Sequence, residues 1–134
     1  MSIIRSGIRS IDDLSGIKEP LLVMSNVNLD EQNLTQLPPI TFDYVGGYFS
    51  CMDNEITSLV GIHKKIKDCL YIYLERNPIK EGGLGLLLIK NLNVLRSELY
   101  PIQIIATYLG KGKRGMIDCQ TELIKKGYKD FAKL

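Results

Sequence analysis

Side chains that could bind an anion stand close together in the segment Gly110-Lys111-Gly112-Lys113-Arg114-Gly115. Its three cations, Lys111, Lys113 and Arg114, stand within four residues, directly before a segment with helical periodicity. Amides at a helix N-terminus favour anions, and neighbouring cations add to that preference. The segment therefore predicts a docking point for a phosphate of RNA, DNA or a nucleotide-derived signal, or for an acidic protein patch. A solvated turn between helices is the alternative interpretation.

The same residues match the spacing G-x-G-x-x-G, and Asp130 stands near the position of the acidic residue of dinucleotide-binding loops. Such a loop needs a buried strand before it, and a helix and a second parallel strand after it. Only 19 residues follow Gly115, too few for both. Met116 and Ile117 stand where a triphosphate-binding loop requires Lys and Ser or Thr. Neither type of nucleotide loop is predicted.

Groups for catalysis or metal binding are sparse. The single histidine, His63, lies among lysines, which is typical of an exposed loop. Adjacent carboxylates, such as Asp12 and Asp13, diverge in extended backbone and do not share a proton. We therefore expect no enzyme, no metal site and no cofactor. Buried free thiols are expected for the cysteines, which lack metal-ligand spacing and are too few for a disulfide framework: Cys51, Cys69 and Cys119.

The first part of the sequence repeats about every 22 residues. One apolar position of the repeat recurs at spacings of 23, 22 and 23 residues. It is occupied by Ile11, Leu34, Ile56 and Ile79. Each of the last three is preceded by an alternating apolar pair, which predicts a short strand with the pair pointing inward. Asn or Gln follows each pair and can satisfy backbone groups at the turn. The sets are Val27, Leu29 and Gln32; Phe49, Cys51 and Asn54; and Ile72, Leu74 and Asn77.

This pattern resembles the leucine-rich repeat, L-x-x-L-x-L-x-x-N-x-L, at a period of roughly 20 to 29 residues. Residues 69–79 fill all five positions of one unit. Residues 46–56 match with Gly46 in the first position, and residues 24–34 match with Gln32 in place of Asn. A degenerate unit around 4–11 resembles an N-terminal cap. The resemblance covers about residues 4–83 and is greatest to the short, irregular repeats of small bacterial and phage proteins.

The expected fold is α/β, with about three strand-turn units and the degenerate unit forming a leucine-rich-repeat solenoid over 1–83. Residues 84–134 are expected to form a helical C-terminal cap that covers the open end of the stack. The cap contains a helix from about 84 to 98 and another around 116–124 that ends near Gly127. Residues 102–109 fit helix or strand, and Pro101 favours helix. The two segments form one compact unit; the alternative is an unrelated mixed domain whose leucines recur by chance.

In this register, three tyrosines and a methionine line the outward strand face. Tyrosine is enriched at interface hot spots, and methionine adapts to irregular partners. The face therefore predicts a protein-binding surface, with packing of the tyrosines against neighbouring repeats or the C-terminal helices as the alternative. The candidate partner-binding residues are Asn28, Asp30, Tyr48, Ser50, Met52, Tyr71, Tyr73 and Glu75.

The resemblance implies a non-catalytic module that recognises another protein. By analogy with small phage proteins, we expect an inhibitor that occludes the surface of a host or defence protein. The alternative function is an anion, nucleotide-signal or nucleic-acid binder that uses the basic segment 110–115 with the nearby Lys125 and Lys126. Charge asymmetry favours a basic C-terminal part: residues 1–83 carry 8 Lys/Arg against 11 Asp/Glu, and residues 84–134 carry 9 against 4.

Composition bounds these hypotheses. A chain of 134 residues and 15.1 kDa, with 45% apolar and 24% charged residues, predicts one folded domain and excludes a large multidomain enzyme. No apolar stretch reaches about 18 residues, and the first residues lack a signal-peptide pattern. We therefore expect a soluble, cytoplasmic protein that interacts with no membrane.

Overall fold

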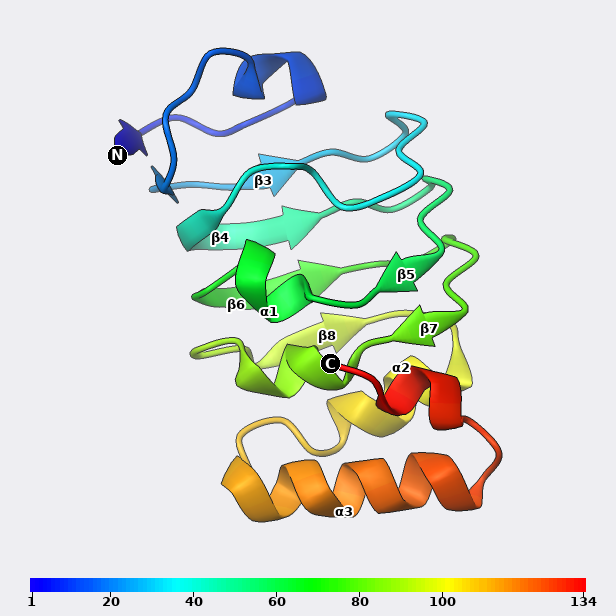
Figure 1. The fold of residues 1–134 in the computed structure, drawn as a ribbon. Helices are drawn as coiled ribbons and strands as arrows, with labels where there is room; N and C mark the ends of the chain where they lie inside the picture. The colour runs from blue at the N-terminus through cyan, green and yellow to red at the C-terminus, as the bar shows by residue number, and fades with distance from the viewer.

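The alternating apolar segments form short parallel strands in a mixed α/β fold, seen in a computed structural model that describes residues 1–134 (Figure 1). The main sheet has the order β1-β2-β4-β6-β8, and β3 also pairs with β4. A second, two-stranded parallel sheet is formed by β5 and β7. The strands are β1 Ser2–Ile4, β2 Leu21–Val23, β3 Val27–Asn28, β4 Phe42–Ser50, β5 Ser58–Leu59, β6 Cys69–Tyr73, β7 Glu81–Gly82 and β8 Val94–Arg96.

Residues one sequence period apart lie side by side in the sheet. Val27 pairs with Phe49, and Phe49 pairs with Ile72. Ile72 pairs in turn with Leu95 on β8. The first three side chains are fully buried, which places this row on the inner face. The period of the sequence is therefore the offset between neighbouring strands.

The segments that return from one strand to the next carry short helices and close the core from the other side (Figure 1). These are the 3₁₀ helices η1 Ile11–Leu14 and η2 Leu84–Leu88, and the single-turn helix α1 Ile62–Lys65. The rings of Phe42 and Phe49 meet edge to face with centroids 5.4 Å apart. The core therefore lies between the strands and the returning segments, and it takes one face of each strand.

The residues 84–98 do not form the expected helix. Residues 84–88 make η2, and Val94–Arg96 form β8, which extends the sheet beside β6. The leucine spacing matched a helical period, but the edge of β6 offers backbone partners to this segment, and pairing at that edge outweighs a local preference. Asn91 also adopts a left-handed backbone, with φ 67°, which interrupts any continuous helix before β8.

The C-terminal helices lie beyond β8 (Figure 1). Helix α2 spans Tyr100–Ala106 with Pro101 in its first turn, so the segment that fitted either structure is helical. Helix α3 spans Gly112–Lys125, and Gly127 adopts φ 87° after it, as the sequence indicated. The 3₁₀ helix η3, Lys129–Ala132, follows. Ile102, Ile105 and Leu123 are fully buried, so these helices extend the apolar core past the last strand.

Buried amide side chains join successive turns. Asn54 accepts hydrogen bonds from the backbone N–H groups of Gln32 and Leu34 and donates to the carbonyls of Leu29 and Cys51. Asn77 repeats this arrangement one turn later: its oxygen accepts from Ile56 N–H and its nitrogen donates to the Cys51 carbonyl. Both side chains are at most 6% exposed. The amides thus satisfy backbone groups that water does not reach.

Replacing Asn54 with leucine is expected to destabilise the protein by about 3 to 5 kcal/mol, because several buried backbone groups lose their partners at once. Gln32 occupies the equivalent position in the preceding turn but is half-exposed and bonds only Ile11 N–H and the Asp30 carbonyl. Gln32→Leu should therefore cost much less. Urea unfolding of the two variants measures the difference; equal losses would show that the buried amide has no special role.

Candidate functional site

The outward residues of the strands form one continuous surface, which we call the strand face. Its central row runs from Asn28 through Ser50 and Tyr73 to Arg96, each paired with the next in the sheet. The row beside it places Tyr48 next to Tyr71. The eight residues predicted to bind a partner thus lie on neighbouring strands, β3, β4 and β6, or in the turns that follow them.

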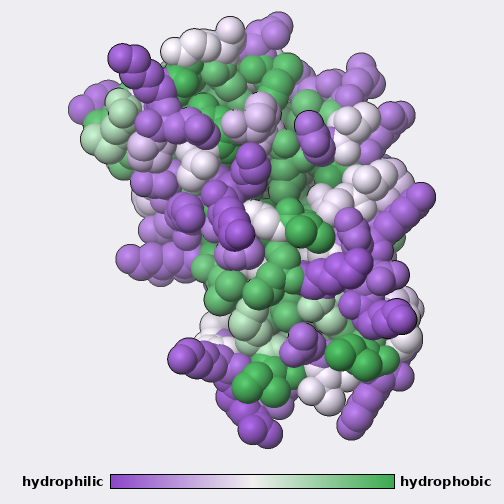
Figure 2. Space-filling model, in the orientation of Figure 1, coloured by the Kyte–Doolittle hydropathy of each residue, from purple (hydrophilic) through white to green (hydrophobic).

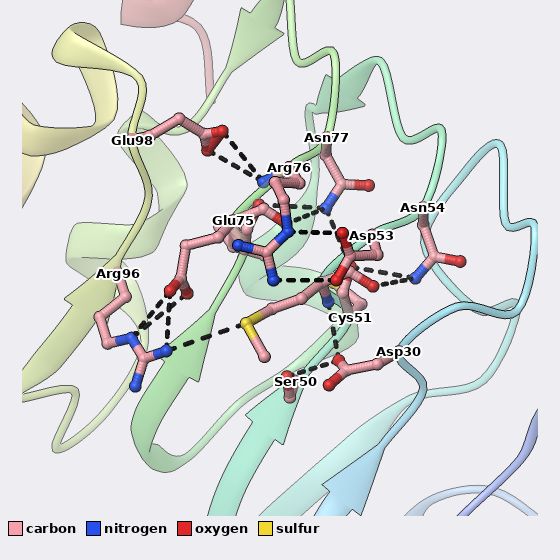
Figure 3. A network of polar contacts seen from close by, with 12 residues as sticks. Asp30, Ser50, Cys51, Asp53, Asn54, Glu75, Arg76, Asn77, Arg96 and Glu98 are labelled. Atoms are coloured by element: carbon pink, nitrogen blue, oxygen red, sulfur yellow. Dashed lines mark hydrogen bonds and ion pairs between the residues drawn. The ribbon is translucent and has the colours of Figure 1, made fainter.

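Two tyrosines of the strand face, Tyr48 and Tyr73, are held in a stack. Their ring centroids lie 5.5 Å apart with 28° between the ring planes, and the Arg96 guanidinium lies 4.1 Å from the Tyr73 centroid. Arg96 also bonds Glu75 at 2.7 Å, and its Nη2 lies 3.8 Å from the Met52 sulfur (Figure 3). These contacts restrict the side chains while leaving them partly exposed, which lowers the entropy lost when a partner binds.

Arg96 was not among the predicted site residues, because the segment that contains it was expected to be helical. A signal was present in the sequence: Leu95 follows Ile72 by 23 residues, the same step that separates Phe49 from the next strand position. Extending the repeat by one more period places Arg96 beside Tyr73, where the structure has it.

Asp30 and Ser50 have a role within the fold. Ser50 Oγ donates to Asp30 Oδ1 at 2.6 Å, and the Met52 amide donates to the same oxygen at 2.8 Å (Figure 3). Ser50 is only 1% exposed, so its side chain lies out of reach of a partner, although the sequence placed it on the outer face. Asp30 therefore fixes the turn after β4 while its second oxygen remains without a bond.

The turns after the strands end in a row of charges. Arg76 pairs with Asp53, one turn before it, and the Glu98 carboxylate accepts from the Arg76 amide at 3.0 Å (Figure 3). Asp53 and Arg76 both have left-handed backbone, as does Glu31 in the preceding turn, with φ between 55° and 60°. The pairing with Arg76 holds the pKa of the Asp53 carboxyl below its ordinary value. These exposed pairs contribute little stability.

The sequence interpretation missed an apolar half of the strand face, at the amino ends of the strands. Ile3 pairs with Leu22, and Leu22 pairs with Tyr44. Leu22 is half-buried and stands between the buried Leu21 and Val23, so this row faces outward. Ile3 and Met24 are about half exposed, at 52% and 48%. The apolar half escaped notice because the repeat motif begins its alternation later in each strand. It adds apolar surface directly beside the tyrosines.

Other exposed apolar groups lie away from the strand face. Figure 2 shows apolar atoms near η1 and, at the opposite end of the molecule, over α3. Near η1, a hollow is lined by Ile11, Leu14 and Ile40 among others. On α3, Ile117 and Ile124 are exposed two turns apart with polar residues between them. Isolated apolar groups of the latter kind are common on protein surfaces.

The basic segment 110–115 is not a loop for most of its length. Gly112 begins α3, so Lys113 and Arg114 lie in its first turn and Lys111 directly precedes it. Arg114 pairs with Asp118 one turn on, at 3.2 Å. Lys126, at the other end of the helix, bonds Glu122 and the Tyr100 hydroxyl. A 14-residue helix spans roughly 20 Å, so the structure does not bring Lys125 and Lys126 to the basic segment.

The three cysteine thiols lie in the interior of the fold. Burial raises the pKa of the Cys51 and Cys119 thiols to about 12 and that of Cys69 to about 11. All three cysteines are buried and unpaired with one another. Thiols with raised pKa values are poor nucleophiles at neutral pH. No cluster of three or more His, Cys, Asp or Glu residues is placed to hold a metal ion.

His63 is packed, where the sequence predicted an exposed loop residue. It lies on α1 against Gly85, where an added Cβ would fall 2.5 Å from Nδ1. That nitrogen is buried and makes no hydrogen bond. Burial, together with the charges of Lys64 and Lys67, lowers the pKa of the imidazole below 6.5. The ring thus packs closely against the backbone of η2.

Because His63 is the only histidine, proton NMR titration reports its pKa without assignment ambiguity. We expect a value below 6.5 in the folded protein. The unfolded chain then binds a proton more readily than the folded one, so the free energy of unfolding should fall as the pH drops through 6.5 toward the folded pKa. Lys67→Gln should raise the pKa slightly. A folded value at or above 6.5 contradicts the burial argument.

Glycine at position 47 makes room for the Asn26 side chain on the strand face. An added Cβ would lie 1.9 Å from Asn26 Oδ1, which accepts a hydrogen bond from the Tyr48 amide at 2.9 Å. Gly47→Ala is therefore expected to break this bond and cost about 1 to 3 kcal/mol. In an Asn26→Ala background the same change should cost much less, because the clash is gone. Chemical denaturation of the four proteins tests this; additive losses contradict the contact.

No model of a known protein family matches the chain, and neither a curated protein nor a solved structure does. None of its helices combines the length and apolar character needed to cross a membrane.

Proposed function

We propose that this chain is a short leucine-rich-repeat solenoid that acts as a non-catalytic protein-binding module. Support for the solenoid form comes from the parallel pairing of residues 22 or 23 positions apart and from the stacked amides of Asn54 and Asn77. In such an architecture each turn contacts only its neighbours, and the outward strand residues are free to vary.

The observation that carries the binding function is the stack of Tyr48, Tyr73 and Arg96 on the strand face. Tyrosine and arginine dominate interface hot spots, and here they are already ordered. Met52 and the apolar row of Ile3, Leu22 and Tyr44 extend the surface that a partner can bury. This combination of an aromatic centre, apolar surroundings and charged turns is the composition of a protein interface.

The anion-binding alternative has less support. Arg114 is engaged with Asp118, and the remaining cations of the basic segment, Lys111 and Lys113, are exposed at the start of α3. A surface that holds RNA or DNA neutralises several phosphates with several free cations. One aromatic ring lies beside the basic segment, that of Tyr108, 5.8 Å from the Lys111 ammonium, and it is half-buried. Stacked aromatic rings of the kind that bind bases lie on the strand face instead, near Asp30 and Glu75.

The consequence of binding is proposed by analogy with small phage proteins of this repeat type. Its three thiols are buried and its acids, cysteines and histidine form no metal-binding cluster, so the proposed module acts on its partner by covering a surface. Inhibition of a host or defence protein by occlusion in the cytoplasm is the form of action that fits this reasoning.

The test compares capture of a partner from a lysate of the candidate host by the wild type and three variants. Tyr48→Ala/Tyr73→Ala is expected to weaken binding by about 30-fold or more, equivalent to about 2 kcal/mol. Tyr100→Ala, an exposed tyrosine on α2, is the matched control and should bind normally. Lys111→Ala/Lys113→Ala/Arg114→Ala should also bind normally, in the presence of nuclease and at raised salt. Thermal unfolding confirms that each variant folds.

Two results contradict the proposal. If capture is lost with the basic-segment variant and kept with the tyrosine variant, α3 is the functional surface. If capture disappears with nuclease or falls steeply with salt, the partner is a nucleic acid.

A further inference from the structure

A polar hollow lies on the strand face beside Tyr48, where the chain from β1 runs past β3. It is lined by Gly7, Ile8, Arg9, Ser25, Asn26, Asn28 and Tyr48. The Ile8 amide bonds the Asn26 carbonyl at 2.9 Å, which holds Arg9 next to the asparagines. The hollow therefore belongs to the same surface as the tyrosine stack, one strand nearer the N-terminus.

The hydrogen bonds inside the fold use the acceptors of this hollow and leave its donors free. Asn26 Oδ1 accepts from the Tyr48 amide at 2.9 Å, and Asn28 Oδ1 accepts from the Asp30 amide at 3.0 Å. Because backbone N–H groups only donate, these bonds fix the orientation of both side-chain amides. The amide nitrogens of Asn26 and Asn28 make no hydrogen bond within the protein and are left to face water or a ligand.

Arg9 adds a free positive charge. The other arginines nearest the tyrosine stack are paired, Arg96 with Glu75 and Arg76 with Asp53. The Arg9 guanidinium forms no ion pair; only its backbone amide contacts an acid, Asp13. An arginine that lines the same hollow as two free amide donors suits an anionic oxygen group, which accepts several hydrogen bonds at once.

We propose that this hollow binds the carboxylate of an Asp or Glu side chain presented by the protein partner. The inference rests on the proposed protein-binding function and names the chemistry of one contact in it. A single free cation suits a single carboxylate, whereas a nucleic acid brings a row of phosphates. Asp30 and Glu75, on the adjoining strand ends, repel a polyanion, and the apolar row beside the hollow suits a protein.

The test is an NMR titration of the wild type with N-acetyl-glutamate-N-methylamide, whose only charge is the side-chain carboxylate. Saturable shifts are expected at the amides of Gly7 and Tyr48 and at the side-chain NH₂ groups of the two asparagines, with a Kd on the order of 10 mM. The glutamine analogue, which is neutral and of the same shape, should leave these signals unchanged.

Arg9→Gln should weaken the titration by about tenfold or more, because it removes the charge-assisted donors. Arg5→Gln is the matched control: Arg5 is exposed four residues earlier, does not line the hollow, and its loss should have no effect. The proposal fails if the glutamine analogue shifts the same signals equally, or if the two arginine variants behave alike. Inorganic phosphate is the third titrant. If phosphate saturates the signals at a lower concentration than the carboxylate compound does, the hollow is a phosphate site and the carboxylate proposal is wrong.

This titration uses no partner, so its outcome is separate from that of the capture experiment. If the tyrosine variant loses capture but the wild type shows no titration signal, only the carboxylate contact is overturned. The opposite result is a saturable carboxylate titration together with unchanged capture by Tyr48→Ala/Tyr73→Ala. It would overturn the proposed function of the strand face and leave the hollow as an isolated binding site.

Discussion

The structure depends on keeping the backbone of each turn satisfied where the chain bends away from the sheet. Asn54 and Asn77 do this from within the core, each bonding its own turn and the one before it. An apolar residue of similar size would fill the space but leave the backbone groups unpaired, which costs more than the burial of the amide. The apolar pairs that precede each Asn then stack in register.

Because the core takes one face of each strand, most side chains of the opposite face are exposed or half-buried. Their chemical character changes along the strands. The amino ends of the strands carry apolar residues such as Ile3 and Met24, the middle carries the tyrosine and arginine stack, and the turns carry paired charges. Together these give one surface with a graded polarity along the strands, in contrast to the scattered apolar groups of α3.

On the strand face, the hydrogen bonds within the fold use side-chain oxygens as acceptors and leave the amide donors of Asn26 and Asn28 free. Side-chain oxygens of Asn26, Asn28 and Asp30 accept from the backbone of the same or next strand, so their oxygens serve the fold. Ser50 is buried by the same arrangement. What remains for a partner is a set of donors near Arg9 and aromatic rings near Arg96. The same side chains therefore stabilise the sheet and determine which chemical groups can bind to it.

The sequence by itself determined the strands of the repeat, the inward apolar pairs, the buried amides and the last helix, because each rests on local alternation or on a spacing repeated along the chain. Only the tertiary structure decided that 94–96 is a strand, since the open edge of β6 outweighs a helical leucine spacing. It also decided that Ser50 is buried, that Arg96 joins the tyrosines, and that Arg9 meets Asn26. These facts depend on which side chains of different turns approach one another, and a spacing along one chain does not encode the distances between turns.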